Sequence, residues 1–168
     1  MYKYSFQQYE EAKMAKAAGV SLPISMKQGR EICRFIKNKN VQKAKSMLDQ
    51  VAEKELAVPY TRFNKNVGHK PGIGSGRFPI KAATEIQKVV ENAEANAQFK
   101  GLNVNNLIIV HAISKQASRP FHYGRQRGRK MKRAHIEIVV QEMEAKKKER
   151  KLQEKSRNKV AETGVKQA

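Results

Sequence analysis

The residues best suited to binding chemistry lie in one basic stretch, positions 114–133. Arginine grips phosphate oxygens through two parallel hydrogen bonds and stacks on bases, and lysine adds a point charge. The stretch contains no acidic residue, and its cationic residues are Lys115, Arg119, Arg125, Arg127, Arg129, Lys130, Lys132 and Arg133. The alternative is a flexible, solvated loop without a partner. A loop of that kind would not need eight positive charges without a single acid. The stretch therefore predicts an arm that binds nucleic acid.

Flat rings interrupt the basic stretch near its middle, in the segment Pro120, Phe121, His122, Tyr123 and Gly124. Aromatic rings between cationic side chains suit stacking on unpaired RNA bases. Gly124 and Gly128 would allow a tight tip or a close approach of the backbone to a partner. We expect this segment to form the tip of the arm.

A second acid-free stretch, residues 60–78, is rich in glycine. It is long for a turn, and long loops in compact domains are usually functional or disordered. Its Gly72, Gly74 and Gly76 do not predict a nucleotide cradle, because no buried strand precedes them and no Lys-Ser/Thr pair follows. We expect an irregular loop that meets RNA backbone. Its candidate contacts are Arg62, Lys65, His69, Lys70 and Arg77.

Catalytic and metal-binding chemistry find little support in the sequence. The four histidines and one cysteine lack metal-ligand spacing, and we expect His111 and His135 to lie opposite each other on the outer face of a sheet. Cys33 lies on the apolar side of a predicted helix, which favours a core residue over a nucleophile. No carboxylate pair stands out, and the acids are expected to serve local charge pairing on helix faces and in the tail. We therefore predict no catalytic residue, no metal, no cofactor and no enzymatic activity.

Composition points to the same partner class. The chain has 168 residues, a formal net charge of +20 and 39% hydrophobic residues. A chain so positive repels itself without counter-charge, and nucleic acid is the densest source of it inside a cell. No apolar run is long enough to span a membrane, and the first residues lack the apolar core of a signal peptide. A single cysteine excludes an internal disulfide framework, so we expect an intracellular protein that does not insert into membranes.

Periodicity predicts an α+β domain of three helices packed on a small antiparallel sheet. The first helix would run over residues 25–38, with Ser25 and Gln28 as a capping box and Gly29, Ile32, Phe35 and Ile36 buried. Asn40 would cap a second helix before Val58-Pro59, with an apolar stripe of Val41, Ala44, Leu48, Val51, Ala52 and Leu56. A third would run from Pro79 to Lys100, with Gly101 ending it and a stripe of Ile80, Ala83, Ile86, Val90, Ala93 and Ala97.

Two strands are predicted, over residues 107–113 and 134–140, with His135 and Glu137 on the face opposite the apolar one. With no helix between them they would pair antiparallel, and the intervening residues would extend the hairpin by about 30 Å. Residues 1–24 would be an extended entry to the domain. We expect one domain over residues 1–142, including the extended hairpin 114–133, followed by a charged tail over 143–168, helical or disordered.

Short motifs spread over residues 2–142 give a resemblance to a known family. They are Tyr4-Ser5-Phe6, Val58-Pro59-Tyr60, Val67-Gly68-His69-Lys70-Pro71, Gly76-Arg77-Phe78-Pro79, Lys81-Ala82-Ala83, Asn92-Ala93-Glu94-Ala95-Asn96-Ala97, Lys100-Gly101-Leu102 and His135-Ile136-Glu137-Ile138-Val139-Val140. In this order they resemble the universal large-subunit ribosomal proteins of the "L twenty-two" family, in its archaeal–eukaryotic form. The hairpin departs from the archaeal Pro-Arg-Ala-x-Gly-Arg pattern and keeps only Gly124-Arg125 of it.

The resemblance implies a cytoplasmic protein of the large ribosomal subunit. Its partners would be large-subunit rRNA, neighbouring ribosomal proteins and the nascent peptide. By position, residues 115–133 match the hairpin that lines the peptide exit tunnel, and residues 62–78 match an RNA-facing loop. Two other classes stay open on the residues alone: a DNA-compacting or general RNA-chaperone module, and an RNA-modifying enzyme. The interleaved rings argue against the first, and no cofactor cleft or catalytic group supports the second.

Overall fold

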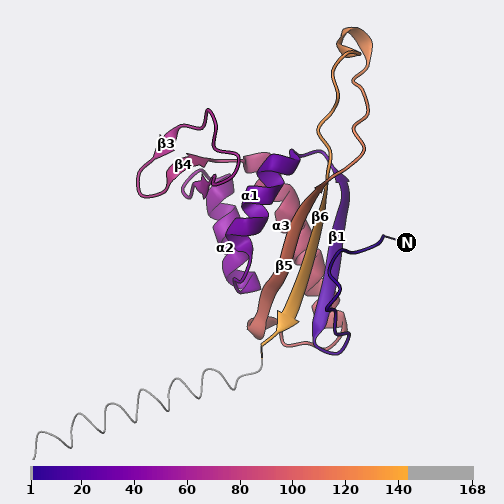
Figure 1. Ribbon diagram of the computed structural model, residues 1–168. Helices are drawn as coiled ribbons and strands as arrows, with labels where there is room; N and C mark the ends of the chain where they lie inside the picture. Colours follow the sequence, from indigo (N-terminus) through magenta and orange to yellow (C-terminus); the bar gives the residue numbers. More distant parts are fainter. Residues whose placement is uncertain (1, 144–168) are drawn as a thin grey trace, which may run out of the picture.

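A computed structural model describes residues 2–143, and the tail predicted over 143–168 lies, but for its first residue, outside the described residues. The main sheet has three antiparallel strands in the order β1-β6-β5 (Figure 1). Its strands are β1 (Met14–Leu22), β5 (Leu107–Gln116) and β6 (Ala134–Glu142). The predicted antiparallel pairing of the last two is confirmed, with Ile109 opposite Val140. The α+β class is confirmed as well.

The N-terminal region contains more regular structure than its sequence predicts. Residues 14–22 form a full edge strand that pairs with β6, with Ala17 opposite Ile138, instead of a simple extended entry. Met14, Ala15 and Ala17 are buried, and small side chains there give only a weak alternation of apolar and polar residues. The strand is therefore defined by its tertiary pairing rather than by its local pattern.

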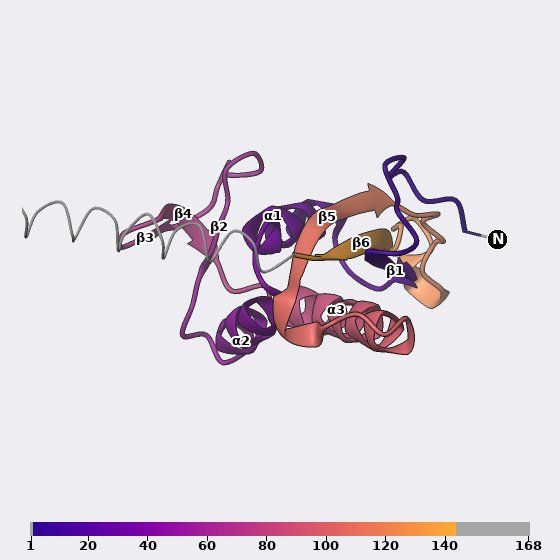
Figure 2. The same cartoon turned by 90° about the horizontal axis from the view of Figure 1, so that it is seen from below.

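Three helices cover one face of the sheet (Figures 1 and 2). They are α1 (Met26–Ile36), α2 (Val41–Ala52) and α3 (Ile80–Phe99). Helix α1 packs against β5, α3 packs against β1 and β6, and α2 packs mainly against α3. Glu94 of α3, almost completely buried, forms an ion pair with Lys45 and accepts a 2.6 Å hydrogen bond from Gln42 Nε2, which ties α2 to α3.

The helix ends confirm one predicted cap and correct another. Asn40 caps α2 by accepting a 2.9 Å hydrogen bond from the Gln42 amide. Ser25 precedes α1, but its side chain makes no capping hydrogen bond, so the predicted capping box was wrong. Helix α2 ends at Ala52, which leaves Leu56 beyond it, and Gly101 follows α3 in the left-handed region at φ +76°.

Most of the predicted stripes enter the core. The fully buried members include Ile32, Leu48, Ile86 and Ile136. Four members of the stripes are less buried: Phe35, Ala52 and Leu56 are half-buried, and Ile80 is 38% exposed. Ile80 is the first residue of α3.

The first residues of the chain cover the outer face of the sheet, where Tyr2 and Ser5 contact Glu137. Two predictions for this face differ from the structure. Glu137 lies on that face as expected, yet it is fully buried. His111 lies opposite Val139, and His135 lies opposite Lys115, so the two histidines are not cross-strand neighbours. A register shift after Ile109 changes the pairing by only one residue, so the expected pairing of the two histidines was wrong because His135 lies four positions away from the partner of His111.

The glycine-rich stretch is more regular than the irregular loop predicted for it. It contains β3 (His69–Lys70) and β4 (Gly74–Arg77), which join β2 (Val58–Pro59) in a second sheet of order β2-β4-β3. Gly72 and Gly74 have φ of +77° and +72°, a conformation that side chains disfavour. The glycines therefore serve a tight hairpin between β3 and β4. A short 3₁₀ turn (Val104–Asn106) precedes β5.

Candidate nucleic-acid interface

The arm extends β5 and β6 beyond the sheet as an exposed two-stranded ribbon (Figure 1). Its strands are joined by hydrogen bonds from the Ala117 amide to the Arg133 carbonyl (3.2 Å) and from the Met131 amide to the Pro120 carbonyl (2.8 Å). At its tip, a 3₁₀ turn (Gly124–Gln126) reverses the chain, with Gly124 at φ +64°. All of residues 118–130 are exposed.

Six of the eight cationic side chains of the arm divide into two groups. Arg119 Nε donates to the Met131 carbonyl, and Arg133 donates to the Ser21 carbonyl, both at 3.2 Å, so these two brace the base of the arm. The second group makes no side-chain hydrogen bond or ion pair within residues 2–143 and is free for a partner. Its members are Arg125, Arg127, Arg129 and Lys132.

The predicted tip rings lie on the exposed part of the arm. Tyr123 is 85% exposed and Phe121 is 57% exposed. The Lys130 ammonium lies 5.1 Å from the centre of the Phe121 ring, which makes a cation–π pair across the ribbon. His122 is exposed too, and its amide donates to the Arg129 carbonyl at 2.9 Å. The turn at the tip begins only at Gly124, so the rings lie on the strand that leads to the tip and can offer flat, unburied faces to a partner there.

Lys115 lies away from the free cations of the arm. It belongs to β5, and its ammonium lies 2.5 Å from Oε1 of the buried Glu137. Burial raises the pKa of Glu137, but hydrogen bonds from Lys115, Ser5 and Tyr2 outweigh it and lower that pKa to about 2. Lys115 is therefore engaged inside the protein.

The candidate residues of the glycine-rich stretch form a second projection, beside α1 and α2 in Figure 1 and separate from the arm. Arg62, Lys65 and His69 are exposed. Arg77 donates to the Asn66 carbonyl at 2.9 Å, and the Lys70 ammonium lies 5.0 Å from the centre of the Phe78 ring. Four of the five candidates are thus exposed, all but Lys70, which is half-buried, and Lys70 and Arg77 contact their own loop.

A buried carboxylate that the sequence did not single out positions the start of this loop. Glu31 is 2% exposed and accepts hydrogen bonds from the amides of Thr61, Arg62 and Phe63 at 3.1–3.2 Å, and from the Thr61 hydroxyl. Burial raises its pKa, but these donors outweigh burial and lower it below its ordinary value. An acid next to Ile32 on the apolar side of a helix was the signal that could have revealed it.

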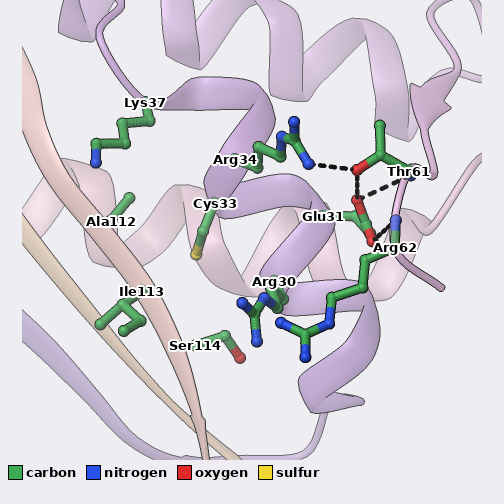
Figure 3. Close-up of a pocket in the computed structure, with 10 residues that line it drawn as sticks. All are labelled: Arg30, Glu31, Cys33, Arg34, Lys37, Thr61, Arg62, Ala112, Ile113 and Ser114. Carbon is green, nitrogen blue, oxygen red and sulfur yellow. Dashed lines mark hydrogen bonds between the residues drawn. The ribbon is translucent and has the colours of Figure 1, made fainter.

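A basic groove between α1 and β5 was also missed (Figure 3). It encloses about 400 Å³, and Figure 3 shows Arg30 directed into it from α1 and Arg62 from the loop after β2. Arg34 and Lys37 complete the basic lining, and Ala112 and Ser114 line the β5 side. The spacing of the α1 cations could have predicted it.

Cys33 is confirmed as a core residue at 2% exposure, and burial raises the pKa of its thiol to about 12. Within residues 2–143, no three His, Cys, Asp or Glu side chains gather into a group that could hold a metal ion. In the same range, no helix combines the length and apolar content needed to cross a bilayer.

These features define a class: a small, strongly basic α+β protein that presents its cations on an arm, a loop and a groove. Comparison with known proteins gives the family. Residues 17–141 match the family described as "Ribosomal protein L22p/L17e". The chain belongs to this family of structural ribosomal proteins.

Similar proteins come from archaea and carry the name "Large ribosomal subunit protein uL22". The one from Methanosphaera stadtmanae is 44% identical over 147 residues, covering 83% of this chain and 96% of the relative. Those from Archaeoglobus fulgidus and Thermofilum pendens are 39% and 38% identical, covering 82% and 85% of this chain and 94% and 98% of the relatives.

Proposed function

We propose that this protein is a structural constituent of the large ribosomal subunit in the cytoplasm, where it binds large-subunit rRNA and aids its assembly. The observation that carries the proposal is the arm, in which residues 118–130 are all exposed and include no acid. A ribbon that buries so little of its own surface suits a partner that surrounds it. Packed rRNA surrounds such a ribbon with phosphates.

The mechanism is electrostatic and geometric. RNA segments that converge in a folded subunit repel one another through their phosphates. Arg125, Arg127 and Arg129 neutralise that charge where segments meet, and release of counterions drives the binding. Arg119, Lys130, Lys132 and Arg133 support the same contacts along the arm, and Lys115 serves by fixing its base. The loop residues Arg62, Lys65, His69, Lys70 and Arg77 bind a second region of rRNA.

The tip has a further role in this proposal. Pro120, Phe121, His122, Tyr123 and Gly124 contribute to the wall of the peptide exit tunnel and meet the nascent chain. Their rings are flat and exposed, which suits both stacking on bases and a smooth tunnel surface. Residues 1–142 act as one domain that anchors the arm 114–133 among rRNA and neighbouring ribosomal proteins.

Sedimentation of the native protein tests the ribosomal assignment. On a sucrose gradient with a high-salt wash, we expect the chain to co-migrate with large subunits at near one-to-one stoichiometry. Replacing Arg125, Arg127 and Arg129 with Ala should reduce incorporation into subunits, and replacing Lys43, Lys54 and Lys88 with Ala should not. Normal subunits with the arm variant would contradict the proposed role of the arm.

Photocrosslinking tests the tunnel. Benzoylphenylalanine in place of Tyr123 should crosslink to nascent chains in stalled ribosomes, and the same group in place of Phe99 should not. Phe99 is a suitable control because it is 94% exposed and lies at the opposite end of the domain, at the end of α3. Crosslinks to rRNA alone from position 123 would contradict nascent-chain contact.

A further inference from the structure

Helix α1 presents a line of cations on one face. Lys27, Arg30, Arg34 and Lys37 are exposed and follow one another at steps of three, four and three residues. Residues at these spacings lie above one another on a helix. At a rise of 1.5 Å per residue, the line covers about 15 Å. This length matches several phosphates of a nucleic-acid strand, which carries one charge per about 3.4 Å of helix axis.

The line borders the seam between α1 and β5, and two hollows follow one another along this seam. The first is the groove of Figure 3, with Arg30, Arg34, Lys37 and Arg62 on its walls. The second encloses about 320 Å³ at the base of the arm and is lined by Lys27, Arg119, Lys132 and Arg133, among others. The seam therefore connects the base of the arm with the far end of α1.

The charge in the groove is not neutralised by the protein. Glu31 is the one acid in its lining, and both of its oxygens accept hydrogen bonds from the loop that follows β2. Arg34 donates to the Thr61 hydroxyl at 2.6 Å. Within residues 2–143, the side chains of Arg30 and Lys37 make no hydrogen bond or ion pair. On the β5 side of the groove, Ala112 and Ser114 have small side chains. They leave space for the sugar–phosphate backbone of a nucleic acid and do not form an apolar pocket.

We propose that the seam between α1 and β5 is a second RNA site, a track that holds the sugar–phosphate backbone of a strand running from the base of the arm. This site rests on the proposed function and adds to it a contact on the globular domain, in the groove lined by Arg30, Arg34 and Lys37. Recognition is by phosphate charge and is independent of base sequence, because no exposed ring lines the groove.

Salt-dependent binding of the full chain to protein-free archaeal large-subunit rRNA tests the site. The groove variant is Arg30→Gln with Lys37→Gln, and the control is Lys43→Gln with Lys54→Gln, exposed residues outside the groove that lose the same charge. If two phosphate contacts are lost, the slope of log affinity against log salt falls in magnitude by about 1.4 to 1.8. The control should keep the wild-type slope, and both variants should keep its urea midpoint.

An arm variant with Arg125, Arg127 and Arg129 replaced by Ala separates the two proposals. If the groove variant behaves as the control while the arm variant binds more weakly, the groove site is wrong and the proposed function stands. If the arm variant also binds as the wild type, the proposed function is contradicted. A polyglutamate peptide is the probe for an acidic protein partner. If the groove substitutions weaken its binding as much as that of rRNA, the assignment to RNA is overturned.

Discussion

The ammonium group of Lys115 lies 2.5 Å from Oε1 of Glu137, where the arm leaves the sheet. The same carboxylate accepts hydrogen bonds from the Tyr2 hydroxyl at 2.8 Å and from the amide and hydroxyl of Ser5 at 2.9 and 2.6 Å. This buried carboxylate on the central strand β6 thus connects the start of the chain with the edge strand β5. Because a buried charge is stable only when it is paired and hydrogen-bonded, these partners must stay in place together.

Glu137 should make the folded protein sensitive to acid. Its pKa is about 2 in the folded state against an ordinary 4.5, so the folded state holds the ionised form more strongly than the unfolded chain. This stabilisation is present above about pH 4.5 and is lost as the pH falls toward 2. The shift corresponds to about 3 kcal/mol. Urea unfolding from pH 6 to pH 2.5 should show this loss.

The variant Glu137→Gln is the control for this prediction. It cannot ionise, so it should be less stable than the wild type at pH 6 and should lose less stability between pH 6 and 2.5. Glu85→Gln, at a half-buried position of α3, should keep the wild-type profile. Equal acid sensitivity of the wild type and Glu137→Gln would show that other carboxylates control the transition.

Local patterns were sufficient for much of the fold. The strands β5 and β6 alternate or concentrate apolar residues, and α2 starts at an asparagine that caps it. These features depend on residues close together in the sequence, so they could be predicted from it. The exposure of the arm followed from its composition in the same way, since a run of like charges cannot form a core.

The partners of the buried acids could not be predicted because they are distant in sequence. Tyr2 and Glu137 are separated by 135 positions, and Glu31 holds a loop about 30 residues away. The position of Glu31 beside Ile32 could indicate its burial, but neither glutamate reveals its hydrogen-bond donors from the local sequence. Lys115 was assigned to RNA for the same reason, since only the fold places a carboxylate beside it. Which cations face a partner is thus a property of the tertiary structure.

Glu31 should control the order of the loop that carries Arg62. Replacing it with Ala removes the acceptor for three amides and a hydroxyl, which should destabilise the protein by about 2 kcal/mol. Hydrogen exchange of the Thr61 and Phe63 amides should become much faster, while amides of α3 change little. Glu31→Gln should have a smaller effect, because its carbonyl oxygen can still accept. Unchanged exchange at these amides in Glu31→Ala would contradict the role given to the carboxylate.

The thiol of Cys33 should not react with thiol reagents in the folded protein, although Cys33 borders the basic groove. Burial raises its pKa to about 12, so almost none of the thiol is ionised at pH 8, and its side chain is out of reach of reagents. A thiol reagent such as DTNB should react at a rate set by unfolding and at a normal rate in urea. Fast reaction in native buffer would mean that α1 separates from β5 readily. Occupancy of the groove by RNA should slow the reaction further.

Gly29 sets how closely α1 approaches the sheet. A Cβ atom at this position would lie 2.7 Å from the Ser114 hydroxyl and 3.2 Å from Cδ1 of Ile136. Gly29→Ala gains about 1 kcal/mol of helix propensity, but overpacking of about 1–3 kcal/mol opposes it. We expect net destabilisation of about 1 kcal/mol, measured by urea unfolding.

A double-mutant cycle shows whether the contact with Ser114 causes that loss. Ser114→Ala removes the hydroxyl that an added Cβ would meet, together with a 3.3 Å hydrogen bond to the Met26 carbonyl. If the clash is the cause, Gly29→Ala should cost less in the Ser114→Ala background, and the coupling should approach 1 kcal/mol. Additive effects would mean that Ile136 sets the limit instead.

Because α1 carries one wall of the basic groove and β5 the other, Gly29→Ala should also widen the seam between them. RNA binding should then weaken more than the change in the urea midpoint alone would predict.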